Sequence, residues 1–532
     1  MQRGDLTKAA LTLDRGRARQ LSAALNVDRQ NESRLPPPEK EKLTSAARAV
    51  ETARLSASED VSRRAWSEYL TLRRQLGLDE EQRLSIDAVQ ARVPERGAII
   101  QLLIAREGSA AFILSGKGEP VVKVVTLRPD TMALLNNLFH QERGGEQNTW
   151  MSTYRRYVGK SERTTTTPSR SSSDYEARYD EWSAMINRAI TVLGELIFDP
   201  VHNALVEIGL ENGAEVIVCP PGELACLPLP MAQLSDGSEF GRHWSVSVAP
   251  RLAILPANVS AASPNKVLVI SPTSAFQNWW DTLPFAKREA RLVKDRFKKD
   301  ARIYLPPGRV DLDKVLRGLE KASIIHAACH GKYDWNEPEK SWLRLAGDQR
   351  LTVRMLSSSV GFMRNARLVF LSACESGIAG ASQVPDEFTG LPISFLQAGV
   401  RAVIGSLWPV FDDAAMLICD RFYHYYLDAQ GHEIMPPARA LSLAQAWLRQ
   451  VSVQELRELG YFATDEMEHL FVPGPNGAIR LRGLESGVTE RPHKRSAKPK
   501  ISSQKEYRSE ENQNLRPYAA AAKWAAFITY GR

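Results

Sequence analysis

The chain has 532 residues, of which 43% are hydrophobic and 25% are charged, and its formal net charge is +7. These proportions exclude a disordered or collagen-like chain and are ordinary for a globular protein of two or three domains. A solvated basic surface accounts for the small positive charge as well as an acidic partner does, so we expect no nucleic-acid partner.

The cysteines are few, scattered and odd in number, which argues against a disulfide framework or a paired-cysteine zinc site. The first residues lack the apolar core of a signal peptide, and no run reaches the ~18 apolar residues of a membrane span. We therefore predict a soluble, cytoplasmic protein that has no membrane partner, no cofactor and no metal site. The five cysteines are Cys219, Cys226, Cys329, Cys374 and Cys419.

Residues 1–92 are predicted to form a short helical region. Residues 9–27 and 40–76 have apolar positions at three-to-four spacing, and the prolines at 36–38 separate them because proline does not fit inside a helix. We expect this region to act as a sensor, dock or lid for a regulatory partner.

Residues 93–260 are predicted to form a first α/β unit. Short β-type runs at 98–104, 110–114 and 121–127 are followed by a helix at 131–139. A Gly/Ser/Thr-rich stretch at 143–174 is typical of a flexible insertion, after which a helix at 180–196 and a strand at 215–219 are expected.

Residues 261–532 alternate between strand and helix patterns, which predicts a mostly parallel sheet with helices on both faces. A basic, low-complexity insertion at 474–512 interrupts this unit, and the apolar stretch at 517–530 is expected to dock onto the core. The predicted strands are 267–270, 302–305, 323–327, 367–372 and 402–405, and the helices are 285–298, 311–321, 353–363, 388–398 and 437–451.

Two of these strands end in a reactive side chain. The run Ile-Ile-His-Ala-Ala-Cys-His-Gly at 324–331 delivers His330, and Leu-Val-Phe-Leu-Ser-Ala-Cys-Glu-Ser-Gly at 368–377 delivers Cys374. Sites in parallel sheets form beyond the carboxyl ends of the strands, where both residues are expected. The histidine precedes the cysteine by 374 − 330 = 44 residues, an order and gap close to those of caspases.

An imidazole beside a thiol suits acyl transfer. A free thiol, with a pKa of about 8.5, is mostly protonated at neutral pH, and a neighbouring imidazole can take its proton to give the reactive thiolate. The backbone N–H groups of Gly331 and Cys374 are the natural pair to stabilise the oxyanion of the intermediate.

A packing role is the alternative for each of these side chains, because free cysteine is among the most buried residue types. We prefer that interpretation for Cys329 and Cys419, and we expect His326 to be a packed core histidine. For His330 and Cys374, the residues alone leave both interpretations open.

The region from about residue 96 to the end resembles the CHAT family of caspase-like proteins, which is related to separases. The resemblance rests on several segments in order, including the histidine motif at 325–331, the cysteine motif at 371–377 and Trp-Ala-Ala-Phe-Ile at 524–528. The other matching segments are 218–230 and 395–410, followed by Asp412 and Asp413.

The resemblance implies a caspase-like sheet flanked by helices, with a degenerate half at 93–260 and an active half at 261–532. It also implies a His330–Cys374 dyad that hydrolyses peptide bonds. The cysteine motif departs from the caspase Gln-Ala-Cys-x-Gly form, so strict specificity for aspartate does not carry over.

The resemblance further implies a substrate that lies extended along Ser406, Leu407 and Trp408 and pairs as an added strand. Acidic residues nearby could bind a basic side chain at the position before the cut, and Asp413 is slightly favoured. Helix capping is the alternative role for the aspartates that precede a predicted helix. The acidic candidates are Asp386, Glu387, Asp412 and Asp413.

The function predicted from the sequence is a CHAT-type cysteine endopeptidase that cleaves specific proteins. Members of the family act in bacterial cell death or anti-phage defence, so the expected substrate is a protein encoded nearby, such as a pore-forming protein or toxin. Two alternatives stay open: a catalytically inactive caspase-like scaffold, and transpeptidation on the same dyad.

Overall fold

The computed structural model describes most of the chain from residue 89 onward. Most of the predicted helical region 1–92 and most of the predicted insertion 474–512 lie outside the described residues. The described ranges are 89–116, 121–140, 148–159, 172–255, 266–272, 285–297, 302–303, 310–379 with gaps at 348, 358–361 and 364, 388–462, 471–473, 479–481 and 515–532, besides isolated positions.

An 11-stranded sheet runs through the described part of the molecule, in the order β3-β2-β1-β4-β5-β16-β13-β12-β8-β6-β7. Most neighbouring strands are parallel, and the exceptions are β3–β2, β2–β1 and β16–β13. The predicted α/β class with a large, mostly parallel sheet is therefore confirmed. The strands are β1 (Ala98–Leu103), β2 (Ala110–Ser115), β3 (Val121–Thr126), β4 (Glu215–Cys219), β5 (Ser245–Val248), β6 (Val267–Ile270), β7 (Arg302–Ile303), β8 (Ile324–Ala328), β12 (Leu368–Ser372), β13 (Ala402–Ser406) and β16 (Phe527–Gly531).

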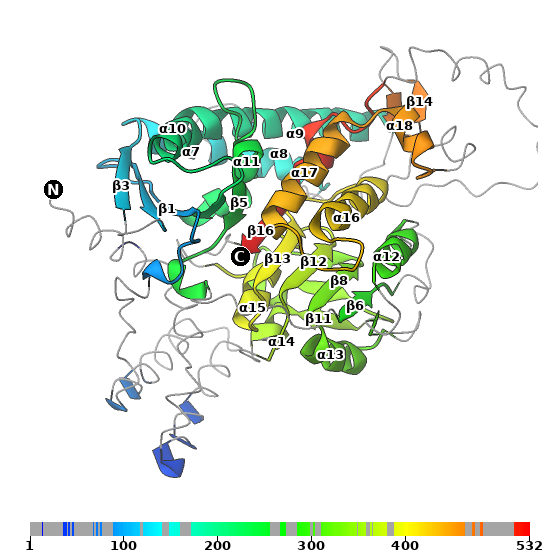
Figure 1. Cartoon of the computed structure of the whole chain (residues 1–532), viewed down its shortest axis with the longest axis horizontal. Coiled ribbons are helices and arrows are strands. Elements are labelled where there is room, and N and C mark those ends of the chain that lie inside the picture. Colours follow the sequence, from blue (N-terminus) through cyan, green and yellow to red (C-terminus); the bar gives the residue numbers. More distant parts are fainter. Residues whose placement is uncertain are drawn as a thin grey trace, which may run out of the picture.

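The C-terminal strand β16 joins the two halves of the sheet. It pairs antiparallel with β13 from one half and parallel with β5 from the other. Figure 1 shows it between these two strands. The apolar stretch that was expected to dock onto the core thus does so as a central strand.

Helices cover both faces of the second half. One face carries α12 (Ala286–Asp295) and α16 (Asp412–Tyr426), and the other carries α13 (Leu312–Lys321), α14 (Val353–Ser357) and α15 (Leu391–Gln397), as Figure 1 shows. Further elements are α17 (Pro437–Gln450), α18 (Val453–Glu458), α21 (Ala521–Trp524), the small sheet of β9 (Gly331–Lys332), β10 (Trp342–Arg344) and β11 (Arg350–Thr352), and the pair β14 (Phe471–Pro473) and β15 (Ile479–Leu481).

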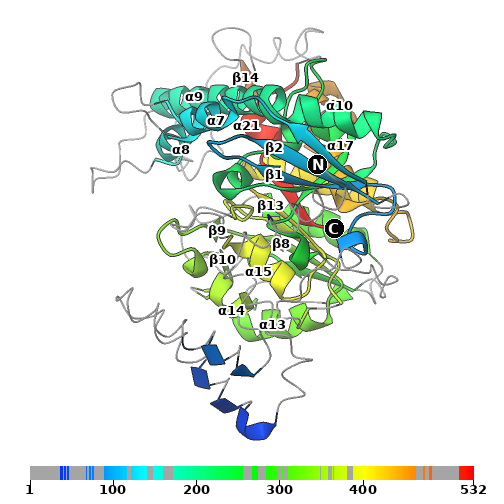
Figure 2. The same cartoon turned by 90° about the vertical axis from the view of Figure 1, so that its left-hand side faces the viewer.

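Helices α7 (Thr131–Phe139), α8 (Trp150–Tyr157) and α9 (Ser172–Leu193) lie together over the first half (Figure 2). Helix α8 contradicts the prediction of a flexible insertion at 143–174 for residues 150–157, whereas 143–147 and 160–171 lie outside the described residues. Its residues form an amphipathic helix whose aromatic face is buried, whereas composition alone had indicated a loop.

One stretch of the described residues is long and apolar enough to span a membrane. It is Ala177–Glu207, which joins α9 to the π-helical turn Gly194–Phe198 and to α10 (Asp199–Glu207), and 56% of its most apolar window is buried inside the molecule. Its buried face includes Trp182, Ile186, Leu193 and Phe198, which belong to the main core. The stretch is thus built like the core helix of a soluble protein.

Candidate active site

The register of the sheet places His330 and Cys374 at equivalent positions, just beyond the ends of two neighbouring strands. Strands β8 and β12 are neighbouring and parallel, and every pair in their register joins residues 44 positions apart, from Ile324 with Leu368 to Ala328 with Ser372 (372 − 328 = 44). His330 and Cys374 share this offset, two residues beyond each strand. Neighbouring strands lie about 4.8 Å apart, so the two residues leave the sheet at the same edge.

Gly331 brings the histidine loop against the cysteine loop. A Cβ at this position would lie 2.7 Å from the carbonyl oxygen of Cys374 and 3.0 Å from the Ala373 Cβ, which is closer than carbon atoms approach. Only glycine therefore permits this contact between the two loops.

The backbone of Gly331 is also suited to the predicted oxyanion role. It lies opposite Leu343 in the β9–β10 pair, and the neighbouring Arg344 N–H donates to the His330 carbonyl at 2.8 Å. Hydrogen-bonded and non-bonded positions alternate in antiparallel pairs, so the Gly331 N–H points away from β10. Strand β10 therefore does not take up that donor.

Burial keeps the Cys374 thiol protonated at rest. Burial raises its pKa to about 11, and the charges of Glu375 and Asp412 act in the same direction, while the Val410 backbone N–H opposes them. The residue as a whole is nonetheless only half-buried, unlike the four other cysteines, which are buried.

Glu375, directly after the candidate nucleophile, is a site residue that the sequence did not single out. Its backbone φ is +57°, and among the described residues every other residue with a positive φ is a glycine. Its side chain is 7% exposed, and its carboxylate accepts hydrogen bonds from the Tyr154 hydroxyl and, at 3.1 Å, from the Tyr333 N–H. Glu375 thus connects the cysteine loop with the histidine loop and with α8.

The rest of the cysteine loop is fixed against β13 and β16. The Ser376 hydroxyl donates to the Leu371 carbonyl at 3.1 Å and accepts from the Ser406 N–H at 3.2 Å. The Gly377 N–H donates to the Ser406 carbonyl at 2.8 Å, and the Gly377 carbonyl accepts from the Tyr530 hydroxyl at 2.7 Å.

The predicted substrate strand is already paired at Ser406 and Leu407, which contradicts that expectation for these two residues. Ser406 pairs with Phe527 of β16, and the Leu407 N–H donates to the Ala526 carbonyl at 2.9 Å. All three side chains are buried. The C-terminal strand β16 already pairs with the edge at which the resemblance implies a bound substrate.

The acidic candidates differ in what they contact. Asp413, the favoured one, is 2% exposed and accepts a hydrogen bond from the Tyr518 hydroxyl at 2.6 Å, so it does not face a substrate. Asp412 is half-buried and accepts from the Phe285 N–H at 2.7 Å, which caps α12 rather than its own helix α16. Asp386 and Glu387 lie outside the described residues.

Asp412 is close enough to Cys374 to influence its charge. Burial raises the pKa of Asp412 to about 8, with Glu289 and Asp413 acting in the same direction and the Phe285 N–H opposing them. A basic substrate side chain would lower that pKa again, because an opposite charge favours the carboxylate. Of the two acidic candidates in the described part of the chain, Asp412 is therefore the one that is not fully buried.

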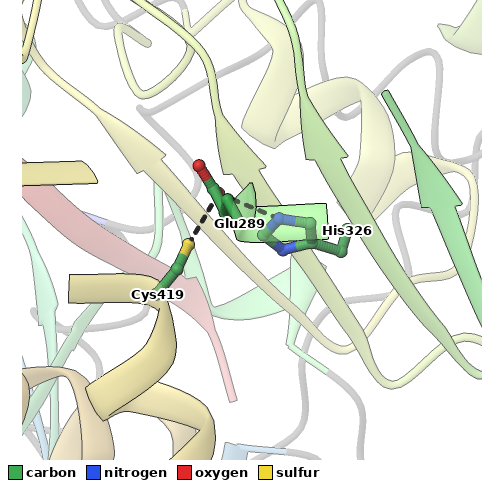
Figure 3. Close-up of side chains that lie close together, drawn as sticks. All are labelled: Glu289, His326 and Cys419. Carbon is green, nitrogen blue, oxygen red and sulfur yellow. Dashed lines mark hydrogen bonds and ion pairs between the residues drawn. The ribbon is translucent and has the colours of Figure 1, made fainter. Parts of the chain in front are cut away.

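A buried group of three polar side chains lies beneath this site, among β8, α12 and α16 (Figure 3). His326 Nε2 lies 2.9 Å from Glu289 Oε1, and the Cys419 thiol donates to the same oxygen at 2.9 Å. The second His326 nitrogen lies 3.4 Å from the Tyr423 hydroxyl. The predictions that His326 and Cys419 are core residues are thus confirmed, since both are 0% exposed.

These three side chains could hold a metal ion by donor type, since imidazole, carboxylate and thiolate are all zinc ligands. Their polar atoms already lie at hydrogen-bonding distance from one another, so most of their hydrogen-bonding capacity is used within the group. Glu289 also raises the pKa of the Cys419 thiol, after the larger effect of burial, which favours the protonated thiol over the thiolate that a metal requires.

Comparison with known proteins adds the following. Two crystal structures of the Saccharomyces cerevisiae separase–securin complex, at 2.6 and 3.0 Å resolution, are similar to this chain at 10% and 11% identity, each with a TM-score of 0.39. The matches cover 73% and 74% of this chain but 32% and 31% of the matched chains, so this chain spans about a third of their length. Comparison with curated proteins gives no match.

A family match covers more than half of the chain. Residues 187–532 match the CHAT domain, and this range contains every candidate site residue from His330 to Asp413. The chain therefore belongs to the CHAT domain family, a family of caspase-like peptidases.

Proposed function

We propose that this protein is a cysteine endopeptidase in which Cys374 is the nucleophile and His330 the general base. The observation that carries the proposal is the shared 44-residue offset, which brings both residues to one edge of the sheet from neighbouring parallel strands. A scaffold that had lost its activity would have no need of a thiol and an imidazole at matched positions.

The mechanism follows from these positions. His330 accepts the proton of the Cys374 thiol as the sulfur attacks the substrate carbonyl carbon, and the carbonyl π electrons move to the oxygen. The N–H groups of Gly331 and Cys374 donate to that oxyanion. The imidazolium then protonates the leaving amine as the C–N bond breaks, and water hydrolyses the thioester, which returns the thiol.

The raised pKa of Cys374 fits a base that acts during attack. The resting thiol is neutral, so proton removal accompanies or directly precedes the formation of the carbon–sulfur bond.

The test is to incubate the protein with a library of proteome-derived peptides and to identify new N-termini by mass spectrometry. Wild type should produce them, whereas Cys374→Ala and His330→Ala should lower the rate by at least about a thousandfold, as loss of a nucleophile or base does. Cys329→Ala is the matched control, because this neighbouring thiol is buried in the core and should be dispensable.

The same library separates the alternatives. If wild type and Cys374→Ala yield the same peptides, the protein is not a cysteine peptidase, and the result supports the alternative of an inactive scaffold. If the products are joined peptides without the gain of a water molecule, the reaction is transpeptidation.

The library also tests substrate specificity. We propose Asp412 as the group that receives a basic side chain before the cut, so Asp412→Asn should remove a preference for Lys or Arg. Asparagine still caps a helix, so the loss of preference would not come from a lost cap on α12. An unchanged preference would limit Asp412 to the capping role.

The biological substrate that we propose is a protein encoded close to this chain, such as a pore-forming protein or a toxin. Support comes from the family's association with cell death and defence. Co-expression of wild type or Cys374→Ala with the neighbouring genes would show whether one product is cut only by the wild type.

A further inference from the structure

Helix α8 carries a row of aromatic side chains on one face. Trp150, Tyr154 and Tyr157 follow one another at helical spacing and pack on Trp182 of α9, with ring centroids 4.6, 5.4 and 5.7 Å away. We call these four side chains the aromatic bridge. Its residues come from the first half of the chain, far from the dyad in sequence.

The aromatic bridge contacts three of the described loops at the edge of the sheet where the dyad lies. Tyr154 lies 5.7 Å from Trp335 of the histidine loop, ring to ring, and its hydroxyl donates to Glu375 of the cysteine loop. The third loop follows β13, and there the Tyr157 hydroxyl donates to the Pro409 carbonyl at 3.1 Å. Trp150 and Trp182 also pack edge-on against Trp408, at 6.1 and 5.6 Å.

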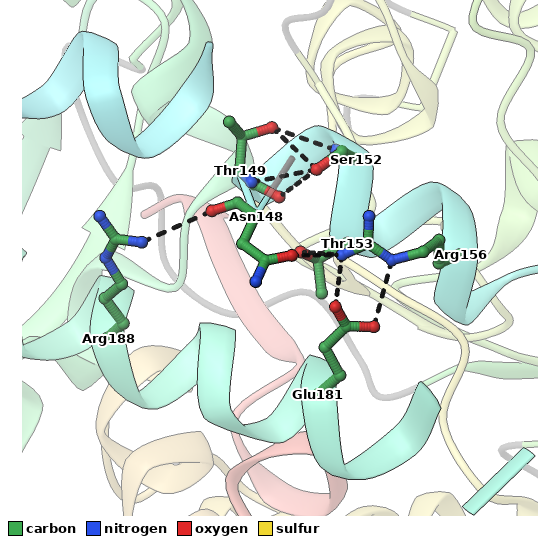
Figure 4. Close-up of polar contacts among 7 residues, drawn as sticks. All are labelled: Asn148, Thr149, Ser152, Thr153, Arg156, Glu181 and Arg188. Atoms are coloured by element: carbon green, nitrogen blue, oxygen red, sulfur yellow. Dashed lines mark hydrogen bonds and ion pairs between the residues drawn. The ribbon is translucent and has the colours of Figure 1, made fainter. Parts of the chain in front are cut away.

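Helix α8 is itself held firmly in place (Figure 4). Thr149 and Ser152 form a reciprocal capping box at its first turn. The Arg156 guanidinium forms an ion pair with Glu181 of α9 and donates to the Asn148 side chain at 2.9 Å. A fixed helix can impose a position on the loops that it contacts.

The Tyr154–Glu375 contact is the one that acts nearest to the nucleophile. A left-handed backbone at a glutamate is uncommon and persists only where the surrounding structure imposes it. Here the two hydrogen bonds to the buried carboxylate impose it. This backbone conformation directs the chain immediately after Cys374.

We propose that Tyr154 is a positioning residue, which acts through Glu375 to set the Cys374 backbone and its oxyanion-binding N–H. The inference rests on the proposed function and deepens it, because the first half of the chain would then control the activity of the second. The helical insertion thereby becomes part of the catalytic unit.

The test compares wild type with Tyr154→Phe, which keeps the ring of the aromatic bridge and removes only the hydroxyl. Cleavage of the peptides found above should fall at least about tenfold in kcat with a smaller change in KM, since the oxyanion donor is misplaced in the transition state. Alkylation of Cys374 by iodoacetamide, followed by mass spectrometry over a pH series, should become faster, because a loosened loop is less buried.

Tyr461→Phe is the matched control, because its hydroxyl also donates to a buried carboxylate, that of Asp420. It should leave kcat and the Cys374 alkylation profile unchanged. If Tyr154 acts through Glu375, adding Tyr154→Phe to Glu375→Ala should cause no further loss.

Three results would overturn the inference. They are a Tyr154→Phe variant with wild-type kcat and alkylation profile, an equal loss in Tyr461→Phe, and additive losses in the double variant. The alkylation readout needs no substrate, so it judges the positioning role even if the wild-type protein cleaves no peptide and the proposed function fails.

Discussion

At the scale of single residues, the candidate site combines a protonated thiol with a neighbour in an uncommon backbone conformation. Cys374 is half-exposed and protonated at rest, and Glu375 holds an uncommon backbone conformation through two hydrogen bonds. Conformations of this kind concentrate where geometry matters for function. Both features point to a loop whose exact conformation decides whether the thiol reacts.

The reactivity of Cys374 should depend steeply on pH. Its pKa is raised to about 11, so the thiol keeps its proton across the neutral range. As long as the pH is below that pKa, each increase of one pH unit raises the thiolate fraction about tenfold. Alkylation by iodoacetamide should therefore keep accelerating from pH 7 to pH 10 in the absence of substrate. A plateau below pH 8 would instead indicate a preformed thiolate–imidazolium pair.

At the scale of elements, the alternation of apolar runs predicted most of the sheet. The strands around residues 98, 110, 121, 215, 267, 324, 368 and 402 were predictable because each is a short apolar run bounded by turn residues. Strand β5 has the sequence Ser-Val-Ser-Val, which is too short to stand out. Strand β16 follows an alanine-rich helical turn and was predicted only to dock onto the core.

The candidate site was predictable only in part, for a physical reason. His330 and Cys374 are marked by chain-local patterns, whereas Tyr154 and Glu375 meet across 221 residues of sequence. The helical spacing of Trp150, Tyr154 and Tyr157 indicates a helix. The polar residues on both sides of them, however, are typical of a loop. Similarly, pairing of Ser406 and Leu407 with β16 follows from tertiary structure and not from their own sequence.

A close backbone contact between Gly377 and Gly405 helps to fix the cysteine loop to β13. A Cβ on Gly405 would lie 2.8 Å from both the Cα and the nitrogen of Gly377, and neither backbone atom can move aside independently. Gly405→Ala should therefore destabilise the protein by about 1–3 kcal/mol, as overpacking does, and should displace the loop that carries Cys374. Urea unfolding and peptide cleavage measure the two effects.

Gly318→Ala in α13 is the comparison for that substitution. Its Cβ would meet the methyl groups of Leu268 at 3.0 and 3.1 Å, which are the ends of a flexible side chain, and alanine favours the helix. It should retain activity. Equal loss of activity in both variants would show that the Gly377–Gly405 contact has no special role.

At the scale of the whole molecule, the two predicted halves share one sheet. Strand β16 is the last segment of the chain, yet it lies at the centre, between β5 and β13. Its Tyr530 hydroxyl also donates to Gly377 in the cysteine loop. Strand β16 therefore links the sheet of the second half to that of the first.

Removing residues 527–532 should consequently expose both halves at once. Strand β13 would lose its partner on one side, and β5 would lose the neighbour that links it to the rest of the sheet. Hydrogen exchange measured by mass spectrometry should then show faster exchange at both 245–248 and 402–406, with less change in β6 and β8, which are not neighbours of β16 in the sheet. Tyr530→Phe is the control, since it keeps the strand and removes only the hydroxyl, and it should retain protection in both strands. Unchanged exchange at 245–248 in the shortened protein would mean that the first half is stable without the C-terminal strand, and that other contacts, such as the hydrogen bond from the Ser442 hydroxyl to the Gly241 carbonyl, hold the halves together.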